Sequence, residues 1–209
     1  MDPYTTLDDF LTRARTRLDP LAGETRLEEG GDIDFLTETE MRSIRQAGVL
    51  IGIRPTASGA TVFLTERPKT MAKHPGQVAF PGGKVDPDDP DEVAAAVREA
   101  HEEVGLPPEA VDLIGRSAPY FTGTGFRIVP VVALVPTEFV PIPEAGEVDE
   151  VFETPLEYLM NPDNHVARST VWKGKARQYY EMPHNGHRIW GVTAGIIRTL
   201  HQALYGPAT

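Results

Sequence analysis

The sequence predicts an α/β protein in which a β-sheet is packed between α-helices. Apolar runs rich in β-branched residues predict strands at residues 46–53, 61–65 and 126–135. Apolar residues at helical spacing predict helices at residues 5–18, 93–104 and 192–205. Strands and helices are mixed along the chain, and this order favours a sheet covered by helices.

Turn residues between these segments predict several smaller elements. Residues 55–59 predict a hairpin turn, and Asn185-Gly186 predicts a second one between strands at 172–181 and 187–190. Further elements are expected as strands at 77–80 and 110–116, a helix at 155–160, and loops at 19–34 and 120–125. Pro130 lies inside a predicted strand, so that strand needs a sheet edge or a bulge there.

Length and composition limit the class of protein. The 209 residues suffice for one domain with a short extension, which we place at residues 1–42 before a domain at 43–209. The chain has no cysteine, so disulfides and cysteine-ligated zinc are excluded and a cytoplasmic location is the default. No apolar run is long enough to predict a membrane span. A net charge of −11 argues against a nucleic-acid partner but permits a small anionic ligand held by local cations and metal.

The central helix has clear start and stop signals. Asp89 is the expected N-cap, with Pro90 in the first helical position and Glu92 three residues after the cap. Gly105 is the expected end of the helix.

Three glutamates in this helix predict a metal site. Glu99, Glu102 and Glu103 stand at i, i+3 and i+4, so their side chains are neighbours whose like charges destabilise a helix by roughly 0.2–0.5 kcal/mol per pair. A hard divalent cation such as Mg²⁺ or Mn²⁺ resolves this conflict, because both prefer oxygen ligands. The alternative is a solvated acidic face, which the glycine pair before the helix and the glycine after it make less favourable.

Residues 98–106 (REAHEEVGL) resemble the second half of the Nudix box, Arg-Glu-apolar-x-Glu-Glu-x-Gly-apolar, at every specified position. In the first half Gly83 stands 15 residues before Arg98, one more than in the general box, and an aspartate, Asp89, takes the usual glutamate position. One extra residue of this kind is a feature of the coenzyme A diphosphatase branch of the family. The resemblance implies the Nudix fold, a mixed sheet sandwiched between helices.

A second motif resembles the same branch. It runs from Leu64 through the connector to Gly83 (LTERPKTMAKHPGQVAFPGG), and similar short matches occur at 120–126 and 189–194. The chain departs from the branch at Pro68, where serine or alanine is usual, and at Ala72, where an arginine is usual. Lys69 or Lys73 can replace that cation. The resemblance covers residues 45–205.

The resemblance implies a metal-dependent hydrolase that cleaves a diphosphate bond, with coenzyme A or its thioesters as substrate and 3′,5′-ADP and (acyl-)4′-phosphopantetheine as products. It implies metal ligands at Glu99, Glu102, Glu103 and the carbonyl of Gly83 or Gly82. Glu99 is also the candidate for orienting or deprotonating the water, and Arg98 for holding a box carboxylate. The implied cofactor is Mg²⁺ or Mn²⁺.

Other candidates lie outside the box. Glu147 stands in an acidic loop and either joins the metal site, acts as a base or is simply solvated. The candidates for substrate binding are Arg67, Lys69, Lys73, His74, Gln77 and Tyr120. Two alternatives stay open: the same chemistry on another nucleotide such as ADP-ribose or NADH, and a catalytically silent nucleotide-binding module. Homodimers are common in the family, so a homodimer is possible.

Overall fold

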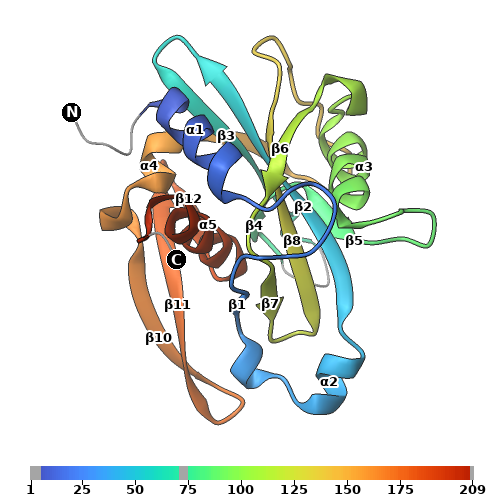
Figure 1. Ribbon diagram of the computed structural model, residues 1–209, viewed down its shortest axis with the longest axis vertical. Helices are drawn as coiled ribbons and strands as arrows, with labels where there is room; N and C mark the ends of the chain where they lie inside the picture. The colour runs from blue at the N-terminus through green and yellow to red at the C-terminus, as the bar shows by residue number, and fades with distance from the viewer. Residues whose placement is uncertain (1–5, 71–74, 208–209) are drawn as a thin grey trace.

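A computed structural model describes residues 6–70 and 75–207, in which the strands form two sheets (Figure 1). The larger, mixed sheet has its strands in the order β1-β7-β8-β2-β3-β4, with β5 paired to β2, β6 to β8 and β9 to β3. Its strands are β1 (Gly30–Gly31), β2 (Arg45–Thr56), β3 (Gly59–Glu66), β4 (Val78–Ala79), β5 (Gly82–Lys84), β6 (Asp112–Arg116), β7 (Tyr120–Thr122), β8 (Phe126–Leu134) and β9 (Glu150–Pro155). The smaller antiparallel sheet consists of β10 (Val166–Trp172), β11 (Lys175–His184) and β12 (His187–Trp190).

Helices cover both faces of the larger sheet. The helices of the described residues are α1 (Leu7–Arg17), α2 (Glu38–Arg42), α3 (Glu92–Val104), α4 (Leu156–Met160) and α5 (Val192–Tyr205), and α2 lies beyond the sheet. Helix α3 packs on one face, where its apolar side meets Leu50 of β2, and α1, α4 and α5 pack on the other, where they meet Ile51 and Ile53. Side chains of successive residues in a strand point to opposite faces of the sheet, so neighbouring residues of β2 contribute to different apolar clusters. The predicted α/β fold with helices on both sides of a sheet is confirmed.

The central strand β8 accommodates Pro130 without being an edge. It runs parallel to β2, with Val49 opposite Pro130. On its other side, β7 pairs with residues 126–128 and β6 with residues 131–134. Pro130 falls at the junction between these two partners, and neither of them pairs with it, so a residue without an N–H is tolerated there. The predicted edge is therefore wrong. A bulge does occur in the pairing of β8, between Leu113 and Gly115 of β6, but it lies opposite Ala133 and Val132 and not at Pro130.

The start of α3 differs from the prediction. The N-cap is Asp91, whose side chain accepts a hydrogen bond from the N–H of Ala94 at 2.8 Å, and the helix begins at Glu92. Asp89 therefore does not cap the helix, because its carboxylate binds an arginine of α3 instead. Gly105 ends the helix in the left-handed conformation, φ 70° and ψ 21°, as predicted.

The N-terminal helix is part of the main core. Phe10 and Ala14 of α1 are each 1% exposed and belong to the same apolar cluster as Leu200 of α5. The side chain of Thr6 caps α1, consistent with the helix expected at residues 5–18. The division of the chain between residues 42 and 43 stays a prediction.

No helix in residues 6–70 and 75–207 combines the length and apolar character that crossing a membrane takes.

Other segments also differ from the prediction: α2 and β9 were not expected, and β1 lies inside the expected loop at 19–34. Gly82–Lys84 forms β5 rather than ending a strand, and the expected loop at 120–125 begins with β7. Strand β10 was not predicted at all. Nearly all of its side chains are exposed, so it lacks the apolar alternation that marks a half-buried strand. The Asn185-Gly186 hairpin is confirmed, since both residues have positive φ.

Candidate active site

The glycine pair before α3 lies directly against a carboxylate of that helix. Gly82 and Gly83 belong to β5, where they pair with Val49 and Gly48 of β2. A Cβ atom on residue 83 would lie 2.2 Å from Oε1 of Glu99 and 2.8 Å from its Oε2. Because the pairing with β2 holds β5 in place, only glycine at position 83 leaves room for the Glu99 carboxylate.

Glu103 is the most buried of the three α3 glutamates predicted as metal ligands, Glu99, Glu102 and Glu103. It is 5% exposed, and the N–H of Gly82 donates to its Oε2 at 3.2 Å. Burial raises the pKa of Glu103 to about 7, partly offset by that hydrogen bond. The charges of Glu99 and Glu147 raise the pKa of Glu103 further, whereas the charge of Arg67 lowers it. Burial also raises the pKa of Glu99. The site therefore concentrates negative charge where water solvates it poorly.

Arg98 holds the acidic side chains in place. Its guanidinium donates from Nε and Nη2 to the Asp89 carboxylate, at 3.0 and 2.9 Å. Nη1 donates to Glu99 at 3.1 Å and to Glu102 at 2.8 Å, and Nη2 also donates to the carbonyl of Lys84 at 3.2 Å. The hydrogen bonds from Arg98 hold the pKa of Asp89 below its usual range. The arginine links the segment before α3 to two carboxylates on it.

The loop after β8 brings a further carboxylate to the site. The N–H groups of Ile142 and Glu144 donate to the last carbonyls of α3, at 2.9 Å each. These bonds cap the C-terminal end of the helix and fix the loop on it. Glu147 follows on this loop, and its charge contributes to the raised pKa of both Glu99 and Glu103. Glu147, predicted from outside the box, therefore lies within electrostatic reach of the box carboxylates.

A cavity of about 270 Å³ opens beside this group. Arg67 and Gln77, from the connector on either side of the undescribed residues 71–74, line it together with Gly82 and Gly83. Residues of β2, β7, β8 and α5 complete the wall, among them Val49, Thr122, Phe126, Thr193 and Ile196. Two segments singled out in the sequence, the connector and the box, thus converge on one hollow.

Other predicted substrate-binding residues lie elsewhere. The side chain of Lys69 is 78% exposed, and its Nζ lies 3.7 Å from Glu66. Tyr120 packs under α5, where a Cβ on residue 195 would lie 2.3 Å from its hydroxyl, and burial raises its pKa to about 12. Lys73 and His74 lie outside the described residues. Neither Lys69 nor Tyr120 is among the residues that line the cavity.

One cluster of possible metal ligands was missed in the sequence. Glu66, Glu150 and His187 present ligand atoms within 4.8 Å of one another, the one such group of three found in the described part of the chain. Pairing of β3 with β9 brings the two glutamates together, and the imidazole stacks on Phe152 with ring centroids 3.6 Å apart. No local pattern could have predicted it, because its members come from three distant segments. The glutamates of the box do not form a group this tight.

The box residues nevertheless suit a hard divalent cation. Their donors are carboxylate and carbonyl oxygens, the ligands that Mg²⁺ and Mn²⁺ prefer. Burial raises the pKa of both Glu99 and Glu103, and a cation bound beside them would stabilise their ionised forms. The glycine at position 83 allows the Glu99 carboxylate to lie close to the backbone of β5.

The chain resembles known proteins over most of its length. The model of the NUDIX domain matches residues 44–173, more than half of the chain. The chain belongs to the Nudix family, and it is a hydrolase acting on diphosphate bonds. Nudix hydrolases generally use divalent metal ions.

Individual relatives agree with this assignment. The chain is similar to proteins described as uncharacterized Nudix hydrolase NudL, with 39% identity to that of Enterobacter sp. (strain 638) over 93% of each chain. The protein of that description from Cronobacter sakazakii is 42% identical over 75% of this chain and 81% of its own. The match to the Enterobacter protein spans 196 residues. Because this is longer than residues 45–209, the similarity extends into the N-terminal segment.

Solved structures include a Nudix hydrolase from M. smegmatis, RenU, at 26% identity and a TM-score of 0.46, covering 53% of this chain and 70% of that one. A C. elegans Ap4A hydrolase is 22% identical with a TM-score of 0.47, covering 55% of this chain and 82% of that one.

Proposed function

We propose that this Nudix hydrolase is a Mg²⁺- or Mn²⁺-dependent diphosphatase that acts on coenzyme A or its thioesters. The products would be 3′,5′-ADP and 4′-phosphopantetheine or its acyl form. The observation that carries the proposal is the convergence of two motifs on one cavity. Arg67 and Gln77, from the connector that resembles the coenzyme A diphosphatase branch, line the same hollow as Gly82 and Gly83 of the box.

The carboxylates of α3 are the proposed metal ligands. Glu99, Glu102 and Glu103 would hold the metal with the carbonyl of Gly83 or Gly82, and a bound divalent cation would offset the charge of the phosphate oxygens. Arg98 cannot act as a base, and its bonds to Glu99 and Glu102 give it a positioning role.

Residues of the chain would also handle the attacking water. The oxygen of water forms a bond to one phosphorus, and the bond from that phosphorus to the bridging oxygen breaks, so that two phosphate monoesters leave. Glu99 is the proposed group that orients the water or accepts its proton. Glu147 is the second candidate, as a base or as an added metal ligand, because its charge acts on Glu99 and Glu103 of α3 from the loop after β8.

The remaining proposed contacts concern the substrate. Arg67 is the best-placed cation for its phosphates, since its charge already acts on Glu103. The other proposed substrate-binding residues are Lys69, Lys73, His74, Gln77 and Tyr120. Among these, Gln77 lines the cavity.

Turnover of a substrate panel tests the proposal. Coenzyme A, an acyl-coenzyme A, ADP-ribose and NADH would each be incubated with Mg²⁺ or Mn²⁺ and ranked by kcat/KM. We expect coenzyme A or its thioester to rank first. A higher rank for ADP-ribose or NADH would keep the chemistry and reject the substrate. Tight nucleotide binding without turnover of any member would establish a silent binding module instead.

A further inference from the structure

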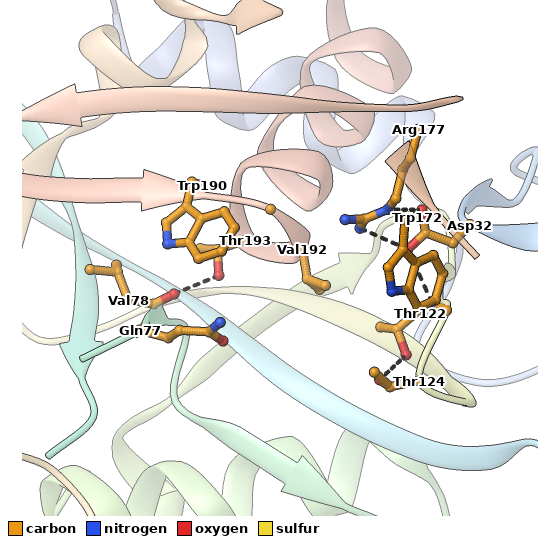
Figure 2. A pocket seen from close by; sticks show the side chains of 12 residues that line it. Asp32, Gln77, Val78, Thr122, Thr124, Trp172, Arg177, Trp190, Val192 and Thr193 are labelled. Carbon is orange, nitrogen blue, oxygen red and sulfur yellow. Dashed lines mark hydrogen bonds and ion pairs between the residues drawn. The ribbon is translucent and has the colours of Figure 1, made fainter. Parts of the chain in front are cut away.

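A second hollow of about 200 Å³ adjoins the cavity lined by Gly82 and Gly83. Figure 2 shows side chains that line this second hollow. The hollow and the cavity share part of their lining, which comes from the connector, the β7–β8 turn and the start of α5. The shared residues are Gln77, Val78, Thr122, Thr124, Val192 and Thr193. A substrate whose diphosphate lies at Gly82 and Gly83 can therefore extend one of its arms into this second hollow.

Two indole rings lie on its walls. Figure 2 shows Trp190 and Trp172 at opposite sides, with Val192 and Thr193 between them. Trp172 ends β10 and Trp190 ends β12, so the smaller sheet supplies both. The side-chain amide of Gln77 lies on the opposite side of the hollow from the smaller sheet.

The position of Trp172 is fixed by its neighbours. A Cβ on residue 123 would lie 2.1 Å from the indole ring, so the glycine there allows the ring to lie on the β7–β8 turn. Phe35 packs on the same indole with ring centroids 5.5 Å apart. Lys173, next in the chain, donates to Glu40 at 2.9 Å. The N-terminal segment thus holds the tip of the β10–β11 hairpin against the hollow.

The lining offers no net charge. Asp32 and Arg177 are its charged members, and they bind each other through two hydrogen bonds of 2.7 and 2.8 Å. Asp32 also accepts from the N–H of Gly123 at 3.1 Å. A pair so satisfied does not recruit a phosphate. A neutral group therefore suits this lining better than a phosphate, and among the parts of a nucleotide substrate that means the base or an uncharged arm.

We propose that this hollow, lined by Trp172, Trp190 and Gln77, binds the purine base of the substrate. A rigid planar ring gains most from aromatic walls, and a glutamine amide has the donor and acceptor that match the edge of adenine. A flexible chain of amides would lose more conformational entropy in the same space. The inference rests on the proposed function only in requiring an adenine-containing nucleotide, which coenzyme A, ADP-ribose and NADH all are.

The test uses the fact that Trp172 and Trp190 are the two tryptophans of the chain. Their fluorescence would be titrated with 3′,5′-ADP, with 4′-phosphopantetheine and with ribose 5-phosphate, in wild type and in the single-tryptophan variants Trp172→Phe and Trp190→Phe. We expect 3′,5′-ADP to change the emission of at least one variant, and the two ligands without a base to leave it unchanged. A response to 4′-phosphopantetheine alone, or none to 3′,5′-ADP, would overturn the proposal.

Steady-state kinetics provide a second test of the base site. Trp172→Ala is expected to raise KM for the best substrate of the panel roughly tenfold with little change in kcat, and Trp172→Phe to restore most of the loss. Unchanged KM in Trp172→Ala and in Trp190→Ala would overturn the proposal. The outcomes separate the two claims, because adenine binding without cleavage of coenzyme A rejects only the proposed function. Cleavage without a fluorescence response to 3′,5′-ADP rejects only the base site.

Discussion

The carboxylate of Glu99 occupies the space that a side chain on residue 83 would need. The closest approach, 2.2 Å between its Oε1 and a Cβ built on Gly83, is far below any real contact. The two residues are 16 positions apart in the sequence, in a strand and in a helix, and β2 holds the strand in place. This contact joins the glycine and glutamate halves of the Nudix box in space.

Gly83→Ala should therefore disable the site without unfolding the protein. The added methyl group must displace the Glu99 carboxylate, and misplacing a catalytic group by about 1 Å costs on the order of 100-fold in rate. Diphosphatase kcat would be measured together with the melting temperature. Full activity with an unchanged melting temperature would show that Glu99 is not needed where the structure places it.

Asp89→Asn should loosen the arginine that positions the box carboxylates. The asparagine keeps the shape but loses the charge that Arg98 binds, and a charge-assisted pair of this kind contributes about 1–3 kcal/mol. We expect a lower melting temperature and a roughly tenfold lower kcat. Asp88→Asn is the matched control, since Asp88 is exposed. Equal effects of the two substitutions would argue that general surface charge, rather than the pair, is responsible.

Without metal, the free energy of unfolding should fall as the pH rises from about 4.5 to about 7. Glu103 has a raised pKa of about 7 in the folded protein against 4.5 when exposed. The folded state therefore binds more protons than the unfolded state within this window, and each unit of pKa difference corresponds to about 1.4 kcal/mol. The full cost, on the order of 3 kcal/mol, is present above pH 7 and absent below 4.5. Denaturant unfolding in EDTA at several pH values measures it.

Glu103→Gln should remove most of this pH dependence because glutamine does not titrate. It should also reduce the stabilisation that Mg²⁺ gives to the wild type at pH 7.5. If the substituted protein kept the same pH profile as the wild type in EDTA, the dependence would arise from another group.

Glu147→Gln should lower kcat if this carboxylate serves the reaction. A general base contributes about 100-fold or more, whereas a solvated glutamate contributes nothing. Glu144→Gln is the matched control on the same loop, because only the backbone N–H of Glu144 bonds to α3. A decrease confined to Glu147→Gln supports a role in catalysis, and parallel behaviour of the two variants would remove Glu147 from the site.

Short-range patterns predicted most of the elements that carry the site. The apolar spacing of α3 and α5 and the stop at Gly105 depend on neighbours a few residues away, and all three are confirmed. The prediction of Asp89 as the N-cap was wrong because of an interaction with a residue farther along the chain. Several aspartates precede α3, and the bond from Arg98 to Asp89 leaves Asp91 to cap the helix. Capping rules that consider neighbouring residues alone do not include the bond between Asp89 and Arg98.

The second hollow could not be predicted from local patterns. Trp172, Asp32 and Gln77 are far apart in sequence, and the strand that ends at Trp172 has nearly all of its side chains exposed. The three glutamates of α3, in contrast, could be predicted as metal ligands because side chains at i, i+3 and i+4 of one helix are neighbours. The spacing of residues inside one helix can be read from the sequence. The lining of a cavity that is built from several separate segments requires the folded structure.

Product analysis with coenzyme A tests the central claim most directly. Wild type and Glu103→Gln would be incubated with coenzyme A and Mg²⁺, and the products identified by mass spectrometry. We predict equal amounts of 3′,5′-ADP and 4′-phosphopantetheine from the wild type, and a rate lower by at least 100-fold for the variant. Intact coenzyme A after prolonged incubation of the wild type, or equal product formation by both proteins, would contradict the account.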